Sequence, residues 1–375
     1  MDTQERFDLI TRNVEEVLTP EDLMQFLENG VKLKHYIGFE ISGKVHLGTG
    51  LVTGQKIADL QKAKVDCSQY LATWHAWINN KLGGDLDVIR KSADYFKEGL
   101  KAGIEIMGGD PEKVKYVNAD ELYHNNDEYW LSVIDISKKL TLARALRAIT
   151  IMGRKEGDSV PLAGLLYAPM QVADIFIQDI NIAHAGIDQR KAQIIAREVA
   201  EKLHIHPLKI NGKIVKPVAL HGHLILGLQK PKIWPVPEDK MQELWSEMKM
   251  SKSVVGSAVY IHDSPDEIRQ KINNAFCPAK ILEFNPILDW SKHLIFVKEK
   301  AVLKIDRPEK FGGNVEYDSY LKLESDFAEG KLHPMDLKKG VGDYIVNLLE
   351  PARKRFEKPA IKKLKEEIEQ VETTR

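Results

Sequence analysis

The chain has 375 residues, which is long for one ordinary hydrophobic core, so we expect two domains. Its composition, 43% hydrophobic and 29% charged, is typical of a soluble globular protein and argues against a disordered chain. The net charge of -1 provides no overall attraction to nucleic acid, although local basic patches can still bind it.

The two cysteines, Cys67 and Cys277, lie far apart, and no Cys/His cluster has the spacing of a zinc site. We therefore expect no bound structural metal and a reducing compartment. The N-terminus is polar, without the pattern of a secretory signal. No apolar run approaches the ~20 residues of a membrane span. Together these features predict a cytoplasmic protein that does not contact membranes.

Strand-like and helix-like patterns alternate up to about residue 203, which predicts an α/β fold with a parallel sheet. Residues 204–239 are richer in Pro, Gly and Lys and are expected to be irregular. Helices are expected from Thr19-Pro20 to Gly30, from about residue 50 to Lys64, and over residues 85–100, 127–154, 170–178 and 188–203, with strands over residues 35–39, 65–74, 114–117 and 180–185.

The alternation ends after Ser264, where Ser264-Pro265-Asp266-Glu267 predicts the capped start of a helix. Further helices are expected over residues 320–329 and 336–354, and the charged tail 362–375 is expected to fray. The boundary is placed near residues 255–270. We predict an α/β domain over residues 1–235, a loop and linker over 236–262, and a mainly helical domain over 263–375.

Two segments carry residues suited to binding a nucleotide. Residues 42–50, SGKVHLGTG, form a glycine-rich turn between a predicted strand and helix, where backbone N–H groups and His46 can donate hydrogen bonds to phosphate oxygens. Residues 249–253, KMSKS, combine lysines and hydroxyls in a mobile cationic clamp for a polyphosphate. Taken alone, the first segment is as compatible with an ordinary turn, and a surface loop is the weaker alternative for the second.

In this order and position, the two segments together resemble the signature sequences of class I aminoacyl-tRNA synthetases. The resemblance implies a Rossmann-like catalytic domain, ATP with Mg²⁺ on the pyrophosphate, and His46, Lys249 and Lys252 as catalytic residues. Such residues act by positioning and by stabilising developing charge, without a covalent intermediate. The first signature usually ends in a second histidine, but this chain has Thr49 at that position.

Further stretches along nearly the whole chain resemble tyrosyl-tRNA synthetases of the archaeal/eukaryotic type. They are residues 36–40, 167–174, 186–191, 311–313 and 333–337. The resemblance implies tyrosine-binding roles for Tyr36 and Asp174 at the phenol and for Tyr167, Gln171 and Gln189 at the ammonium. It implies ATP-binding roles for Gly38, Glu40, His46, Gly48, Asp188, Lys249, Ser251 and Lys252.

The residue types at the predicted amino-acid site agree with this resemblance. Tyr167, Gln171 and Asp174 have helical spacing and share one face. Asp174 lies within an apolar run, where an acid without a function is rare. A carboxylate with a hydroxyl suits a phenol, which both donates and accepts. Thr73 departs from the family pattern, because relatives carry an aspartate there.

The resemblance also implies contacts with tRNA(Tyr). Arg147, Arg190 and Lys191 correspond to residues that read the acceptor stem, although solvated helix faces would explain them equally well. Phe311, His333 and Asp336 correspond to residues of an anticodon-binding domain, where an aromatic ring stacks on a base and a carboxylate accepts from guanine. A core phenylalanine and a helix N-cap are the alternatives. A homodimer is expected through residues 127–166, with two-fold symmetry.

Three other functions remain open from the sequence. A tryptophanyl-tRNA synthetase shares both nucleotide motifs, but an indole only donates, which suits Tyr36 and Asp174 less well. A synthetase-like protein without catalysis is disfavoured by His46 and the intact 249–253 segment. A nucleotidyltransferase acting on a small metabolite is disfavoured by the helical C-terminal domain.

Overall fold

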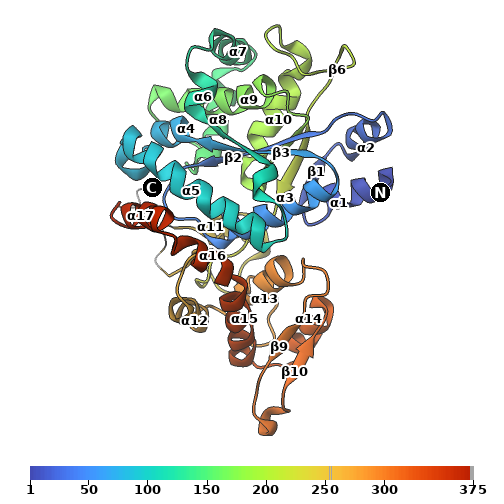
Figure 1. The fold of residues 1–375 in the computed structure, drawn as a ribbon, viewed down its shortest axis with the longest axis vertical. Coiled ribbons are helices and arrows are strands. Elements are labelled where there is room, and N and C mark those ends of the chain that lie inside the picture. The colour runs from blue at the N-terminus through green and yellow to red at the C-terminus, as the bar shows by residue number, and fades with distance from the viewer. Residues whose placement is uncertain (253, 255, 372–375) are drawn as a thin grey trace.

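The computed structural model of the protein describes residues 1–252, 254 and 256–371. The α/β part lies above the C-terminal part in the view of Figure 1. Its six-stranded sheet has the order β1-β8-β5-β2-β3-β4, with β1 antiparallel to β8 and every other neighbouring pair parallel. The predicted α/β class is confirmed. The strands are β1 (Glu16–Leu18), β2 (Lys34–Glu40), β3 (Asp66–Ala72), β4 (Val114–Asn118), β5 (Ile182–Gly186) and β8 (Val218–Gly222).

Helices pack on both faces of this sheet and form most of the C-terminal part (Figure 1). None of the helices in the described part of the chain is both long and apolar enough to cross a bilayer. The helices of the α/β part are α1 (Thr3–Thr11), α2 (Pro20–Glu28), α3 (Thr53–Lys62), α4 (Thr73–Ile78), α5 (Leu86–Ile106), α6 (Ala119–Tyr123), α7 (Asp127–Lys138), α8 (Leu142–Ala148), α9 (Tyr167–Ile177) and α10 (Arg190–Val199).

The C-terminal part is mainly helical, as predicted, although the helix expected over residues 336–354 is divided at Leu349 into α15 and α16. Ser264 and Glu267 form a reciprocal capping box at the start of α12, as expected from their spacing. The elements here are α11 (Met241–Met248), α12 (Pro265–Asn273), α13 (Pro286–Trp290), α14 (Tyr320–Glu329), α15 (Pro334–Leu348), α16 (Glu350–Phe356) and α17 (Pro359–Glu369), with the hairpin strands β9 (Leu303–Ile305) and β10 (Val315–Tyr317). A second short hairpin, β6 (Lys209–Ile210) and β7 (Lys213–Ile214), belongs to the α/β part (Figure 1). The division of the chain at residues 235 and 262 stays a prediction.

The prediction of an irregular region over residues 204–239 is wrong for β8. All five residues of β8 are buried, between β5 and β1. A short strand covered on both faces shows no alternation of apolar and polar residues, so its sequence lacks the usual strand signal. The three-residue β1 was missed because it is too short to show any period.

Two helical predictions need correction. The helix expected over residues 127–154 is interrupted after α7, and Thr141 caps a separate helix, α8. The tail expected to fray is ordered through Glu369, because α17 packs against α5 and buries Ile368. Residues 372–375 lie outside the described part. Helix α17 has enough apolar residues at helical spacing to pack on α5. Its many charged residues concealed this pattern in the sequence.

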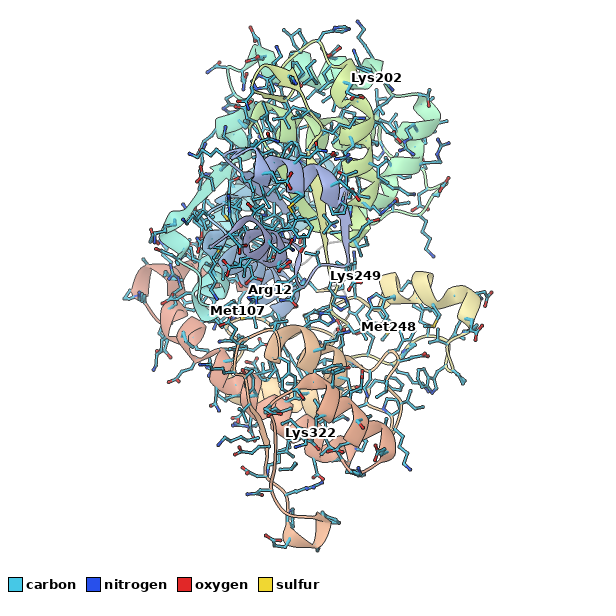
Figure 2. All side chains as sticks on the ribbon, turned by 90° about the vertical axis from the view of Figure 1, so that its right-hand side faces the viewer. Arg12, Met107, Lys202, Met248, Lys249 and Lys322 are labelled. Atoms are coloured by element: carbon cyan, nitrogen blue, oxygen red, sulfur yellow. The ribbon has the colours of Figure 1, made fainter. Side chains whose placement is uncertain are left out.

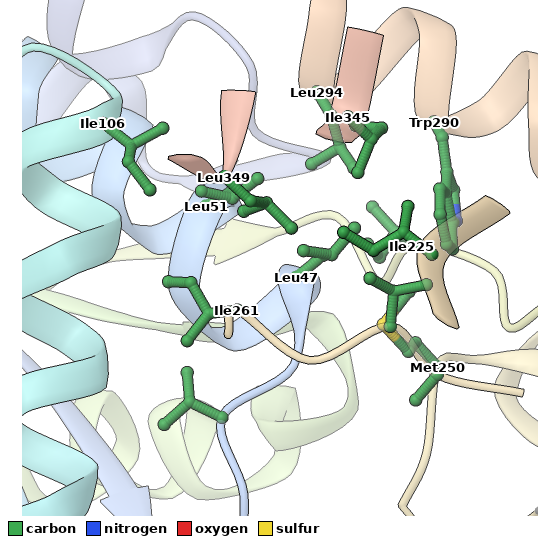
Figure 3. Close-up of a cluster of buried hydrophobic side chains, with 14 of the residues drawn as sticks. Leu47, Leu51, Ile106, Ile225, Met250, Ile261, Trp290, Leu294, Ile345 and Leu349 are labelled. Carbon is green, nitrogen blue, oxygen red and sulfur yellow. The ribbon is translucent and has the colours of Figure 1, made fainter. Parts of the chain in front are cut away.

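One hydrophobic core joins the two parts of the molecule (Figure 3). Leu47 and Leu51, which lie within and just after the first nucleotide segment, pack in the same cluster as Ile345 and Leu349 of the C-terminal part. All four side chains are completely buried. The segment that carries His46 is therefore held from the C-terminal side as well as by its own sheet.

Glycines allow α3 and α5 to approach each other closely. A Cβ atom at Gly103 of α5 would lie 2.2 Å from the carbonyl oxygen of Gly50, and one at Gly54 would lie 2.4 Å from the carbonyl oxygen of Gly103. One turn earlier in α5, a Cβ at Gly99 would lie 2.7 Å from Val45. The nucleotide segment can rest on α5 only because these positions lack side chains.

We expect Gly103→Ala to lower the free energy of unfolding by about 1–3 kcal/mol, because the added methyl group meets backbone that cannot move aside easily. Gly342→Ala in α15 is the matched control, since its nearest side-chain atom would be 3.8 Å away. The control should be neutral or stabilising by up to about 1 kcal/mol. Urea denaturation measures the free energy of unfolding of both variants. If Gly103→Ala is as stable as the control, the close contact is contradicted.

Candidate active site

A cavity of about 770 Å³ opens at the carboxyl ends of the parallel strands. In the sheet, β2 lies between β3 and β5, so chain crossovers leave it on opposite sides and open a crevice there. Every residue predicted for the amino acid and nucleotide sites lines this cavity: Tyr36, Gly38, Glu40, His46, Gly48, Tyr167, Gln171, Asp174, Asp188, Gln189, Lys249, Ser251 and Lys252.

Strand β2 supplies one wall of the cavity. Tyr36, Gly38 and Glu40 are two residues apart, so they share one face of the strand and all three line the cavity. A Cβ atom at Gly38 would lie 2.8 Å from the hydroxyl oxygen of Tyr36. The glycine therefore leaves room for the Tyr36 hydroxyl.

Asp174 of α9 lines the cavity and is completely buried. Its Oδ1 accepts hydrogen bonds from the hydroxyls of Tyr123 at 2.9 Å and Tyr129 at 3.2 Å. Its Oδ2 has no hydrogen-bond partner within the described residues. Burial raises the pKa of Asp174 to about 8, and the two tyrosine hydroxyls act in the opposite direction. The cavity lining thus includes a carboxyl group with one oxygen that lacks a donor.

Amide and hydroxyl groups occupy the middle of the cavity. The Tyr167 hydroxyl donates to Glu40 at 3.2 Å. The Gln171 amide donates to the side chain of Gln189 at 3.4 Å, and Gln189 in turn donates to the carbonyl of Ile151 at 2.8 Å. These polar groups are held in place by one another and by backbone.

His46 lies in a turn that other segments fix. Leu47 and Ile261 make backbone hydrogen bonds that pair residues 45–47 with residues 259–261. The backbone N–H of Thr49 donates to Nδ1 of His46 at 3.3 Å, so Nε2 carries the hydrogen and faces the Thr49 hydroxyl at 3.2 Å. Burial, followed by Lys252 and Lys249, lowers the pKa of His46 to about 3. The imidazole is neutral at pH 7.

Both lysines of the second nucleotide segment line the cavity and have polar partners. Nζ of Lys249 forms an ion pair with Asp188 at 2.5 Å, and Figure 2 shows Lys249 near the junction of the two parts. Nζ of Lys252 donates to the Ser42 hydroxyl at 3.0 Å. Burial, with repulsion from Lys81, lowers the pKa of Lys252 to about 7, which Glu40 partly offsets. Ser253 lies outside the described residues.

The comparisons with known proteins decide the family. The family described as tRNA synthetases class I (W and Y) matches residues 28–350. A tyrosine–tRNA ligase from Thermococcus sibiricus is 57% identical over 96% of each chain. The chain belongs to the archaeal-type tyrosyl-tRNA synthetases. The predicted resemblance is confirmed.

Solved structures of synthetases support the same assignment. A tyrosyl-tRNA synthetase from Pyrococcus horikoshii, crystallised with L-tyrosine, is 55% identical, with a TM-score of 0.94 over 98% of this chain and 100% of that chain. A tryptophanyl-tRNA synthetase from Aeropyrum pernix, 16% identical over 100% of this chain and 90% of its own, has a TM-score of 0.66 and shares the fold. The tryptophanyl alternative is therefore less supported.

The residues predicted to contact tRNA lie outside the cavity, in two groups. Arg147 is exposed at the end of α8, where its carbonyl accepts from Lys191 at 3.0 Å. Arg190 is engaged by Glu16, at 2.7 and 2.8 Å. In the C-terminal part Phe311 is 58% exposed, so it is not a core residue. His333 caps α15, in whose first turn Asp336 is half-buried.

The cavity offers a divalent cation few free carboxylates. Glu40 faces Lys81 at 3.3 Å and Asp188 faces Lys249, so both acids at the nucleotide end already have cationic partners. Within the described residues, the group close enough to hold an ion is Glu15, His223 and His293, which flanks the strand ends. The donor set at the nucleotide end thus does not fit a resident Mg²⁺ site.

Several cavity residues were missed from the sequence. Tyr70 and Ala72 pair with Gly38 and Glu40 across the β2–β3 ladder, so they share the cavity wall. Only the register of the sheet reveals this adjacency. Ser42, His75, Asn79 and Lys81 also line the cavity.

We expect the stability of the unliganded protein to fall as pH rises toward 8, because the unfolded chain releases a proton from Asp174 at about pH 4 that the folded chain keeps to about pH 8. Asp174→Asn cannot ionise. Its melting temperature relative to wild type should therefore increase between about pH 5 and pH 8. The control Asp87→Asn alters a side chain that is 83% exposed and should give a constant difference. A constant difference for Asp174→Asn would refute the buried-acid assignment.

Proposed function

We propose that this chain is a tyrosine–tRNA ligase that forms tyrosyl-adenylate and pyrophosphate from L-tyrosine and ATP, then transfers tyrosine to the 3′ end of tRNA(Tyr). The observation that carries the proposal is the division of one cavity. In its lining, the Tyr36 hydroxyl lies near Asp174, whose Oδ2 has no partner within the described residues, whereas His46 lies near Lys249 and Lys252. The Pyrococcus horikoshii relative, solved with L-tyrosine, supports the choice of amino acid.

Tyr36 and Asp174 are proposed to hold the phenol of tyrosine. In the tyrosine complex Asp174 is proposed to be ionised, so that its Oδ2 accepts the phenolic hydrogen while the Tyr36 hydroxyl donates to the phenolic oxygen. The ammonium group lies among Tyr167, Gln171 and Gln189, whose oxygen atoms accept its hydrogens. Phenylalanine would leave the buried carboxyl group without a partner, which is costly. Tyrosyl-tRNA synthetases are the standard example of this cost, since they reject phenylalanine by about 10⁵-fold without an editing step.

The chemical step is proposed to occur between this pocket and residues 249–252. The tyrosine carboxylate attacks the α-phosphorus, the bond to the bridging oxygen breaks, and pyrophosphate leaves with the electron pair. Neutral His46 donates through Nε2, and Lys249 and Lys252 neutralise the leaving group, whose charge grows in the transition state. Asp188 receives the ribose, while Gly38, Glu40, Gly48 and Ser251 flank the nucleotide.

Mg²⁺ is proposed to enter with ATP, on its phosphates. Because Glu40 and Asp188 are paired with lysines, the chain supplies no acidic cage there, and the ion belongs to the substrate. The ion neutralises phosphate charge together with the lysines.

The tRNA is proposed to contact both parts of the molecule. Arg147, Arg190 and Lys191 are proposed to contact the acceptor stem: Lys191 contacts Arg147, and Glu16 engages Arg190 in the free protein. Phe311 is proposed to stack on an anticodon base, because its ring is exposed; His333 and Asp336 would read base edges beside it.

A cytoplasmic homodimer is proposed. The predicted interface, residues 127–166, exposes large apolar side chains on neighbouring helices, which a second copy would cover. They are Leu131, Ile134, Leu142, Leu146, Leu162 and Leu166.

The proposal is tested by amino-acid-dependent ATP–pyrophosphate exchange with each of the twenty amino acids. Tyrosine alone should support rapid exchange. Exchange driven best by tryptophan, or by none of them, would overturn the assignment.

We expect Lys249→Ala to slow adenylate formation by about 10²–10³-fold with tyrosine affinity nearly unchanged, because its charge acts on the leaving pyrophosphate. Single-turnover kinetics and equilibrium dialysis measure the two quantities. Lys232→Ala is the matched control: this lysine is 77% exposed and paired with Glu247 on the surface, so its loss should change neither. An unchanged rate for Lys249→Ala would remove the residue from the catalytic set.

We expect Phe311→Ala and Asp336→Ala to weaken charging of tRNA(Tyr) while leaving pyrophosphate exchange intact, because neither residue lies near the cavity. Leu321→Ala, a change at another exposed apolar side chain of the same part, is the control. If both variants charge tRNA like the control, the anticodon assignment is wrong.

A further inference from the structure

Three buried tyrosine hydroxyls, of Tyr70, Tyr123 and Tyr129, are linked by hydrogen bonds to one another or to Asp174. Tyr123 ends α6, Tyr129 lies in the first turn of α7, and Tyr70 lies in β3. Each is at most 1% exposed. Tyr123 and Tyr129 do not line the cavity, so they contact Asp174 without reaching the space for a substrate. Neither of these two residues belongs to a motif that the sequence revealed.

We propose that Tyr123 and Tyr129 are positioning residues for amino-acid selection: they occupy Oδ1 of Asp174 and so leave Oδ2 as the one oxygen that can reward a substrate hydroxyl. This inference rests on the proposed tyrosine ligase function and deepens it. The preference for a substrate with a ring hydroxyl then depends on the carboxyl group of Asp174 and on the buried tyrosines: Tyr123 and Tyr129 directly, and Tyr70 through its hydrogen bond to Tyr123.

The hydrogen bonds at Asp174 are one-sided. Both hydroxyls approach Oδ1, which has two lone-pair directions and therefore no further site for a strong donor. Oδ2 has no hydrogen-bond partner in the described part of the chain; its near neighbour is Nε2 of His75, at 3.9 Å. Of the two oxygens of Asp174, a phenol that enters the cavity thus meets only Oδ2 as a free acceptor.

Tyr123 and Tyr129 donate hydrogen bonds of different strength to Asp174. The Tyr129 hydroxyl is 3.2 Å from Asp174 but also 3.4 Å from the carbonyl oxygen of Met170, so its hydrogen has two acceptors. Tyr123 donates at 2.9 Å and accepts the hydroxyl hydrogen of Tyr70, which polarises its own O–H bond. Tyr123 is therefore the stronger donor.

Packing fixes this geometry. The rings of Tyr123 and Tyr129 lie 4.2 Å apart with an angle of 32°, and Trp74 meets Tyr123 edge-on at 5.2 Å. With both rings held, the carboxyl group of Asp174 cannot rotate without losing two hydrogen bonds. Donors to Oδ1 also favour the ionised carboxylate, which accepts a phenolic hydrogen more strongly than a neutral acid does.

The test compares kcat/KM in pyrophosphate exchange for L-tyrosine and L-phenylalanine. We expect Tyr123→Phe to lower the value for tyrosine about 10-fold and to leave phenylalanine unchanged, which narrows the ratio. Tyr129→Phe should do the same to a smaller extent. Tyr116→Phe is the matched control, because it removes a buried hydroxyl that has no hydrogen-bond partner in the described residues and lies outside the cavity.

The ratio of kcat/KM for tyrosine to that for phenylalanine distinguishes a loss of amino-acid selection from a general loss of activity. A variant that loses activity equally on both amino acids, or keeps the wild-type ratio, would overturn the inference, whereas thermal unfolding confirms that the compared variants are folded. A wild-type protein that does not activate tyrosine would overturn the proposed function itself, before any variant is considered.

Discussion

The close contact between α3 and α5 is the constraint on which the nucleotide end of the site depends. Gly50, Gly54 and Gly103 bring two backbones to a distance that excludes any side chain. The turn with His46 lies between β2, which ends at Glu40, and α3, which begins at Thr53, and the segment just after it rests on Gly103 of α5. Glycines that resembled a phosphate-binding loop in the sequence therefore serve helix packing as much as ligand access.

The cavity separates two kinds of electrostatic environment. At Asp174, burial favours protonation of the carboxyl group, and tyrosine hydroxyls counteract that tendency. At its nucleotide end, burial and neighbouring positive charges lower the pKa of Lys252 and His46. A substrate with a neutral hydroxyl at one end and a polyphosphate at the other matches both environments at once. The ion pair with Asp188 holds Lys249 at the cavity wall.

Much of this arrangement could be predicted from the sequence. The alternation of strands and helices identified the sheet, and the signature segments with the helical spacing of Tyr167, Gln171 and Asp174 identified residues that line the cavity. Strand β8 was not predicted, because complete burial removes the alternating pattern on which strand prediction depends. Tyr123 and Tyr129 escaped because a contact with Asp174 across about 50 residues exists only after the helices pack, and no local pattern records it.

Helices α16 and α17 of the C-terminal part pack against α5. Helix α5 therefore contacts both parts of the molecule. Arg355 of α16 binds Glu98 and Glu105 on α5, beside the glycines that support the His46 turn. Helix α5, with 21 residues, thus contacts the His46 turn at its glycines and the C-terminal part at Glu98 and Glu105. A change in the position of the C-terminal part would therefore act on α5, the helix against which the His46 turn also packs.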